Sequence, residues 1–244
     1  MDELLSAVLD AHGGLDDWQS VRRLRARFSR GGPFWTARGW PVLANETVTL
    51  DAHREHIEFT PFLAEDRTSV FDVDPERVTI RNRDGHVIEE RTRPRDSFPS
   101  QFDPFATPWD AIQVAYFASA AMWNYLTEPF GFTYPGVQAR EIEPWNEDGE
   151  TWRRLAVTFP PSNANHNPDQ VFYYDERFML RRMDYSPEVT RQPADCPLHA
   201  RSQDVRRVRV PNAPARVPPR RGRCRRQSVA VIKFDIDAVA VERC

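Results

Sequence analysis

The spacing of apolar residues changes along the first part of this chain. Residues 2–11 repeat leucine and valine at intervals of three and four, which is the pattern of an amphipathic helix, and Gly13 ends it. From Val21 onward apolar and polar residues alternate one by one, as they do in a strand with one buried face. The pattern therefore predicts a short N-terminal helix followed by β-strands.

Several strand candidates follow one another without a helical pattern between them. They cover residues 21–28, 34–39, 46–51, 55–61, 68–72, 77–81 and 87–91. Short turn sequences separate them, among them Asp84-Gly85, which is typical of a tight hairpin. Successive strands joined by short turns pair side by side in opposite directions, so this region predicts an antiparallel meander.

Residues 108–127 form the one long segment with the pattern of a buried helix, and Pro129 ends it. On a helical projection its polar side chains gather in a sector of about 100°, and apolar side chains fill the rest. The polar residues of that sector are Asp110, Gln113, Asn124 and Thr127.

Strand candidates resume after this helix. They cover residues 138–144, 151–159, 170–175, 178–185 and 229–241. A lone buried helix among many strands predicts an α+β fold. We expect a curved antiparallel sheet, or half-barrel, with an N-terminal helix and one central buried helix against its concave face.

The length of 244 residues and the hydrophobic share of 40% suit a single domain spanning residues 1–244. Fifteen Phe, seven Trp and six Tyr supply bulky side chains for a core or a wide cavity. Lys233 is the only lysine, so arginine provides almost all positive charge. The codon usage of a GC-rich genome explains this bias better than selection for nucleic-acid binding.

Residues 194–227 depart from the pattern of their neighbours. Between Arg201 and Arg226 the chain holds ten arginines, one acidic residue and four prolines, and no aromatic residue. Three interpretations stay open: a disordered basic arm that binds a polyanion, a solvated loop, or a frame-shifted stretch of translation. The last is favoured, because reading residues 199–226 one base later, with suitable synonymous codons, can restore a strand-like sequence.

Motifs for catalysis or metal binding are weak. His53 and His56 are three residues apart on an expected strand, where their side chains point to opposite faces and cannot easily share a metal ion. His166 in a polar loop is the candidate general base, but no nucleophile motif accompanies it. The three cysteines match neither a disulfide framework nor a zinc site. We expect no catalytic residue, no metal and no cofactor.

Aromatic residues of the central helix and the strands form the candidate ligand-binding set. A half-closed sheet around one helix can leave an apolar cleft, and Trp and Tyr suit the boundary between an apolar wall and a polar rim. The alternative is a plain packed core. The candidate lining residues are Trp35, Phe59, Phe71, Trp109, Tyr116, Trp123, Tyr125 and Phe172.

The start of the sequence shows no basic leader, no apolar run and no cleavage site. No segment is long and apolar enough to predict a transmembrane helix. These observations predict a soluble, cytoplasmic protein.

Three stretches, AHGGLDDWQSVRRL, TPWDAIQVAYFASAAMWNYLTEPF and EIEPWNEDGETWRRLAVTFP, are similar to an uncharacterised family of bacterial proteins. The order of elements resembles the bacterial lipoprotein-carrier fold, the LolA-like half-barrel. This resemblance covers about residues 4–185 and resumes near residue 228. It implies a concave apolar face that binds acyl chains or another hydrophobic ligand. It carries over no functional residue, because that fold binds by a surface.

These features favour a non-enzymatic binding protein that holds a hydrophobic, lipid-like small molecule in the hollow of a half-barrel. One alternative is an enzyme that acts on a hydrophobic substrate with His166 as base. The other is polyanion binding between Arg201 and Arg226, with nucleic acid the less favoured partner.

Overall fold

The computed structural model describes residues 1–40, 43–98, 108–147, 149–185, 188, 198–201 and 232–244. Within this part of the chain the strands form two sheets, and every pair of neighbouring strands is antiparallel. Most of the segment at residues 194–227, predicted to be irregular, lies outside the described residues.

The first sheet has seven strands in the order β12-β1-β2-β3-β4-β5-β6. Its first six strands in the sequence form the predicted meander, and the C-terminal strand β12 returns to pair with β1. The strands are β1 (Val21–Gly31), β2 (Leu43–Asp51), β3 (His56–Thr60), β4 (Arg67–Val73), β5 (Glu76–Asn82), β6 (Val87–Thr92) and β12 (Lys233–Arg243).

The second sheet has five strands in the order β11-β10-β9-β8-β7. Its two hairpins, β7–β8 and β9–β10, are the strand pairs expected after the central helix. The strands are β7 (Gln138–Glu147), β8 (Glu150–Thr158), β9 (Asp169–Tyr174), β10 (Leu180–Tyr185) and β11 (Leu198–Arg201).

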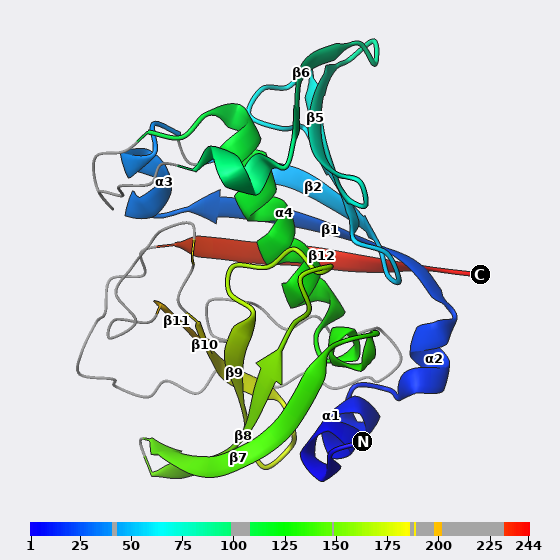
Figure 1. The fold of residues 1–244 in the computed structure, drawn as a ribbon, viewed down its shortest axis with the longest axis vertical. Helices are drawn as coiled ribbons and strands as arrows, with labels where there is room; N and C mark the ends of the chain where they lie inside the picture. Colours follow the sequence, from blue (N-terminus) through cyan, green and yellow to red (C-terminus); the bar gives the residue numbers. More distant parts are fainter. Residues whose placement is uncertain (41–42, 99–107, 148, 186–187, 189–197, 202–231) are drawn as a thin grey trace.

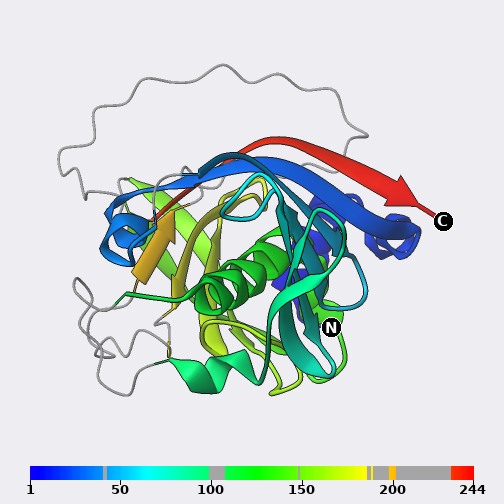
Figure 2. The same cartoon turned by 90° about the horizontal axis from the view of Figure 1, so that it is seen from above.

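The central helix α4 (Ala111–Thr127) lies between the two sheets (Figure 1). Seen from above, β1 and β12 arch over it (Figure 2). Every residue of α4 except Asn124 and Tyr125 is buried. The helix begins three residues later than predicted, because Asp110 accepts a hydrogen bond from the Gln113 backbone N–H and Gln113 reaches back to the Asp110 N–H.

Apart from the exposed Asp110 at the start of α4, the polar sector of the helix faces the interior. The Gln113 side chain donates to the Ser97 carbonyl at 2.7 Å, and Asn124 donates to the Ala164 carbonyl at 3.3 Å. Thr127 donates to the Trp123 carbonyl one turn back. These bonds satisfy the polar groups internally, so a helix with a polar stripe can be enclosed on all sides.

The N-terminal helix α1 (Glu3–Ala11) buries its leucines and valine as predicted, and α2 (Leu15–Gln19) buries Trp18. The strand predicted at residues 34–39 is wrong. That segment forms the short helix α3 (Pro33–Ala37), because Pro33 stands at the start of the helix, where its fixed φ is favourable and its missing N–H costs nothing.

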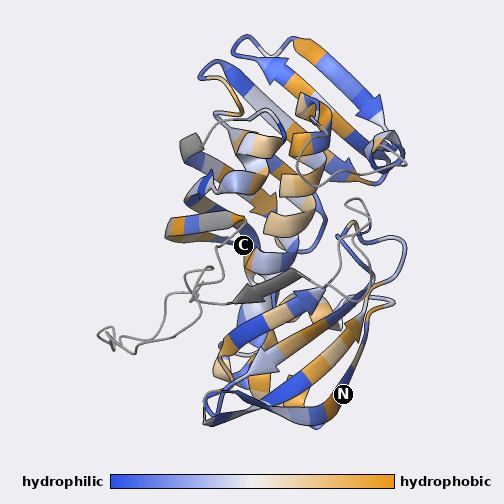
Figure 3. Cartoon of the chain, turned by 90° about the vertical axis from the view of Figure 1, so that its left-hand side faces the viewer, coloured by the Kyte–Doolittle hydropathy of each residue, from blue (hydrophilic) through white to orange (hydrophobic). Residues whose placement is uncertain are grey.

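Two 3₁₀ helices flank α4 in the sequence. They are η1 (Pro94–Ser97) and η2 (Phe130–Thr133). Hydropathy bands alternate along the strands of both sheets, and α4 between them is pale to hydrophobic (Figure 3). Apolar side chains from the two sheets and from all four α-helices join one buried cluster around α4.

The predicted α+β class, with curved, open antiparallel strands, an N-terminal helix and a buried central helix, is confirmed. The structure adds a detail that the sequence pattern did not contain. The strands around the concave face divide into two separately hydrogen-bonded sheets, and α4 lies where these sheets meet.

Candidate functional site

All eight predicted lining residues lie in the interior around α4, and all except the half-buried Tyr125 are buried. The N-terminal end of the helix holds Trp35 and Trp109. Phe34 packs against both indole rings, with ring centres 5.3 Å away in each case. Phe117 on α4 contacts the same two indoles, so this end of the interior is densely aromatic.

The middle of the helix packs against the seven-stranded sheet. Tyr116 meets Phe71 of β4 edge to face, with ring centres 5.5 Å apart. Phe59 of β3 packs against Phe28 of β1 at 5.6 Å. Offset and edge-to-face geometries are the favourable ones for such pairs, so this side has the properties of a packed core.

In the C-terminal half of α4, the candidates Trp123 and Tyr125 make contacts on different sides of the helix. Trp123 packs on Tyr134, and its indole N–H donates to the Asp51 carbonyl at 3.1 Å, which fixes the ring. The hydroxyls of Tyr125 and Tyr185 form a 2.7 Å hydrogen bond between α4 and β10 of the five-stranded sheet. Burial raises the pKa of Tyr125 to about 12.

Phe172 of β9 lies farther along the interior. Its ring contacts Phe132 of η2 at 4.6 Å between centres. The structure therefore brings the eight candidates into one interior but places them on different sides of α4. Those toward the seven-stranded sheet make ring contacts of a packed core, whereas Tyr125 presents a polar tip to the five-stranded sheet.

A polar group also lies in this interior beside η1, and Arg95 stands at its centre. The Arg95 guanidinium donates to the Asn165 carbonyl at 3.3 Å and pairs with the Glu188 carboxylate. Its charge also acts on Tyr116 and His166. We call Glu55, Arg95, Tyr116, Asn165 and His166 the Arg95 cluster. Apart from Arg95, each member is at least nine-tenths buried.

Glu55 is the most enclosed acid of the Arg95 cluster. Its Oε2 accepts hydrogen bonds from the Ala164 N–H at 2.9 Å and from the Asn163 side chain at 3.2 Å. Burial raises the pKa of this carboxyl well above its ordinary value, and the nearby Glu76 adds to the effect against the bond from Ala164. Burial therefore favours the protonated, neutral form of Glu55.

His166 stacks on Phe117, with ring centres 4.0 Å apart, and lies beside Tyr185 at 5.6 Å. Burial, together with the positive charge of Arg95, lowers the pKa of His166 to about 3. The imidazole is neutral at pH 7 and is a weak base. This property argues against the alternative in which His166 serves as a general base.

The alternating pattern of β3 predicts that Glu55 is buried, although a charged residue is usually assigned to the surface. Ile57 and Phe59 are the buried positions of β3, and a period of two extended backwards places Glu55 on the same face. Arg95 has no comparable signal, because it lies in a short 3₁₀ helix that follows an exposed edge strand.

A second buried polar pair lies at the β1–β2 ladder. Arg30 donates to Glu46 at 2.8 Å, and both side chains are almost fully enclosed. The Trp35 and Phe62 rings flank the guanidinium, 5.2 and 5.4 Å from its carbon. Burial raises the pKa of Glu46 to about 7, against the attraction of Arg30. The rings and the partner acid enclose this pair within the core.

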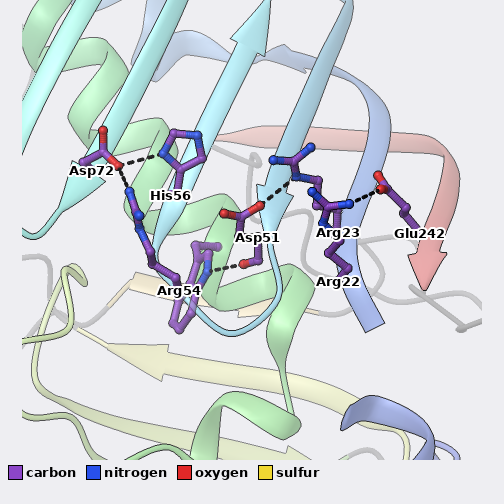
Figure 4. A network of polar contacts seen from close by, with 8 residues as sticks. Arg22, Arg23, Asp51, Arg54, His56, Asp72 and Glu242 are labelled. Carbon is purple, nitrogen blue, oxygen red and sulfur yellow. Dashed lines mark hydrogen bonds and ion pairs between the residues drawn. The ribbon is translucent and has the colours of Figure 1, made fainter. Parts of the chain in front are cut away.

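Two histidines that the sequence raised as metal candidates serve other roles. His56 pairs with Asp72 at 2.7 Å, and Arg54 reaches the same carboxylate (Figure 4). The His53 ring packs instead near Trp18, with ring centres 6.0 Å apart. Across the described residues, no cluster of three or more His, Cys, Asp or Glu side chains could hold a metal ion.

Figure 4 also shows ion pairs that cross the strands of the seven-stranded sheet. Arg23 of β1 pairs with Asp51 of β2 at 2.8 Å, and Arg22 with Glu242 of β12 at 3.3 Å. These side chains are substantially exposed, so each pair contributes little to stability.

The helices that the structure describes include none with both the length and the apolar character needed to cross a bilayer. Cys244 is a free, exposed thiol. Cys196 and Cys224 lie outside the described residues.

Comparison with known proteins finds similar folds at low identity. A DUF1329 family protein from Desulfovibrio piger has a TM-score of 0.38 and 12% identity over 78% of this chain and 76% of that one. A LolA superfamily protein from Nitrosomonas europaea has 0.37 and 10% over 98% and 93%. A domain assigned to outer membrane lipoprotein sorting from Vibrio parahaemolyticus has 0.35 and 8% over 98% and 91%.

No family model and no curated protein matches the chain. Proteins of the LolA superfamily are thus among the similar solved structures, as the resemblance in the sequence predicted. All three TM-scores lie below 0.5. The predicted cytoplasmic location gains no support from these structures and stays a prediction.

Proposed function

We propose that this protein is a non-enzymatic binding protein that holds a hydrophobic, lipid-like small molecule between α4 and the five-stranded sheet. The observation that supports this proposal is the division of the strands. Between the described strands of the two sheets there is no ladder of backbone hydrogen bonds. The sheets can therefore separate along α4 while each keeps its own ladders.

The contacts between α4 and the side of the five-stranded sheet can break without disrupting either sheet. They include the Tyr125–Tyr185 hydroxyl pair, the bond from Asn124 to the Ala164 carbonyl, and the stack of His166 on Phe117. Side-chain contacts of this kind re-form more readily than a β-ladder, because each can break independently of the others. An apolar ligand that enters here replaces ring contacts with equivalent apolar contacts and gains roughly 25 cal/mol per Å² buried.

The same contacts support a single domain for residues 1–244. Side chains of α4 take part in the apolar cluster together with both sheets, so neither sheet covers its apolar face alone. We propose that the two sheets unfold together, in one cooperative transition followed by far-UV circular dichroism.

Binding is tested by titrating the purified protein with the neutral fluorescent probe N-phenylnaphthylamine near pH 7. We expect saturable uptake at about one probe per chain, and displacement of the probe by long-chain alcohols or acids. The near-UV circular dichroism spectrum must stay unchanged, because a loosely packed state also binds such probes.

A matched pair of variants locates the bound probe. Ala118→Leu on α4 fills space inside the interior, because Ala118 is fully buried, and should reduce probe uptake strongly. Val87→Leu adds similar bulk to an exposed position of β6 and should leave uptake unchanged. Absence of saturable uptake by the well-folded wild-type protein would contradict the proposed function.

A further inference from the structure

Several polar atoms of the Arg95 cluster are buried without a hydrogen-bond partner among the described residues. They include Glu55 Oε1, Asn165 Oδ1 and His166 Nε2. Among the residues that the structure describes, the Tyr116 hydroxyl also makes no hydrogen bond of normal geometry, although the charge of Arg95 lies close enough to favour its ionised form. An unsatisfied buried polar group costs about 1–3 kcal/mol, so several together indicate a place where another polar group binds.

The orphaned atoms offer both donors and acceptors. Glu55 Oε2 accepts from Ala164 and Asn163, so in the protonated form that burial favours, Oε1 can carry the proton as a donor. The Tyr116 hydroxyl is a second donor, because burial raises its pKa above the ordinary value. Asn165 Oδ1 is an acceptor. A hydroxyl or amide group can satisfy donors and acceptors of this kind at once.

The charges around the cluster disfavour an anionic group. Arg95 is the cation, and it already pairs with the Glu188 carboxylate. Glu76 lies close enough to affect both Glu55 and Tyr116, and its own pKa is raised by burial against the attraction of Arg95. A carboxylate brought here would compete with Glu188 for Arg95, would be repelled by Glu76, and would lose its hydration as well.

Aromatic rings around the Arg95 cluster would contact the apolar part of the ligand. Phe117 covers one face of the His166 ring, and Tyr185 lies beside it on the five-stranded sheet. Phe98 approaches Tyr116 at 5.9 Å between ring centres. An alkyl or aryl body can lie along these rings while its polar end reaches Glu55 and Tyr116.

We propose that the Arg95 cluster is the polar end of the ligand site, and that it selects an uncharged hydrophobic molecule bearing a hydroxyl or amide group over the corresponding carboxylate. This inference rests on the proposed function and specifies the chemical class of its ligand. Glu55 and Tyr116 donate to the ligand's oxygen, and Asn165 accepts from it.

The test is competition against N-phenylnaphthylamine by a long-chain alcohol and by the acid of equal chain length near pH 7. We expect the alcohol to displace the probe at a concentration about tenfold lower than the acid requires, the equivalent of about 1.4 kcal/mol. A primary amide of the same chain should behave like the alcohol, because it is also neutral and donates hydrogen bonds.

Two substitutions separate the polar contact from folding. Tyr116→Phe keeps the ring against Phe71 and should weaken displacement of the probe by the alcohol several-fold, while displacement by the acid changes less. Glu55→Gln keeps an acceptor for Ala164 and a neutral donor, so it should retain the preference for the alcohol. Glu55→Leu, which removes both, should lose that preference.

The matched control is Tyr173→Phe. This substitution also removes a phenol hydroxyl, which donates to Asp184. The Tyr173 ring packs against Trp145, so it lies outside the Arg95 cluster. This variant should bind the alcohol like the wild type.

The outcomes separate the two proposals. Probe uptake with equal displacement by alcohol and acid, or with no effect of Tyr116→Phe, overturns the inference and leaves the proposed function standing. That result would mean that buried water satisfies the cluster. No probe uptake by the folded protein overturns both.

Discussion

The two sides of α4 differ in the side-chain contacts that they make with the two sheets. Toward the seven-stranded sheet, Tyr116 packs edge to face on Phe71, and the Trp123 indole is fixed by a backbone carbonyl. Toward the five-stranded sheet, the contacts include polar tips, the Tyr125–Tyr185 hydroxyl pair and the neutral His166 ring.

This difference gives different roles to the two sides of α4. We call the contact surface with the seven-stranded sheet the first boundary and the contact surface with the five-stranded sheet the second boundary. The first is a packed core in which every removed atom leaves a cavity. The second combines apolar faces with polar ends, and it adjoins the Arg95 cluster, where buried polar atoms lack partners among the described residues. Stability should therefore depend chiefly on the first boundary, and ligand binding on the second together with the Tyr116 hydroxyl of the Arg95 cluster.

The largest effect should come from Phe71→Ala. Removing this buried ring leaves a cavity beneath Tyr116, and we expect a loss of about 3–5 kcal/mol in the free energy of unfolding. Urea denaturation measures it. The matched control Val87→Ala truncates an exposed side chain of β6 and should change stability by about 0.5 kcal/mol or less. Similar losses for both variants would show that this side of α4 is not a packed core.

The next effect concerns pH. Since the folded-state pKa of His166 is about 3 and its ordinary value is 6.5, the folded protein binds fewer protons than the unfolded chain between these values. Its contribution to stability is therefore present above about pH 6.5 and is lost as the pH falls toward about 3.

His166→Phe should remove this contribution. Denaturation near pH 6.5 and near pH 4.5 should show a smaller acid-induced loss in the variant than in the wild type. Replacing the exposed His86 by Gln should leave the loss unchanged. Equal losses in wild type and His166→Phe would mean that His166 is accessible to protons in the folded state.

A smaller effect should come from the hydroxyl pair at the second boundary. Tyr125→Phe and Tyr185→Phe each remove one end of a buried hydrogen bond, and each should cost about 1 kcal/mol. The double variant should cost less than the sum, because the second substitution leaves no orphaned hydroxyl. Strict additivity in this double-mutant cycle would show that the two hydroxyls do not interact.

The smallest effect should come from Ser119→Ala on α4. The Ser119 hydroxyl is buried without a hydrogen-bond partner among the described residues, so its removal should change stability by about 0.5 kcal/mol or less, or raise it. Thermal unfolding checks this. A clear loss of stability would reveal a partner, such as a buried water, that the hydroxyl needs.

The sequence predicted this architecture well where one periodicity acted alone. The buried helix and the antiparallel meander followed from helical and alternating patterns, and both are present. The prediction of a strand at residues 34–39 was wrong because Pro33 and the preceding glycine start a helix within a short apolar stretch. The division into two sheets was not predictable, because the alternating pattern does not show which strands pair, and β6 and β7 on either side of α4 belong to different sheets.

The sequence pattern placed the aromatic candidates and named His166, but it did not indicate Glu55, Arg95 or Asn165 as members of the site. Aromatic residues are apolar and bulky in any context, so Tyr116 and Trp109 could be assigned to the interior from their type alone. Glu55 and Arg95 resemble surface charges in the sequence, and only the fold buries the first and half-buries the second. The predicted roles of residues 194–227 concern residues that lie largely outside the described part of the chain.

The most direct test of the central claim is quenching of tryptophan fluorescence by an ω-brominated long-chain alcohol, using a Trp145→Phe variant to remove a surface indole. If an apolar molecule binds beside α4, quenching should saturate at about one ligand per chain, because the buried Trp109 and Trp35 lie in that interior. Weak quenching that rises without saturation would show only collisions at the surface and would contradict the account.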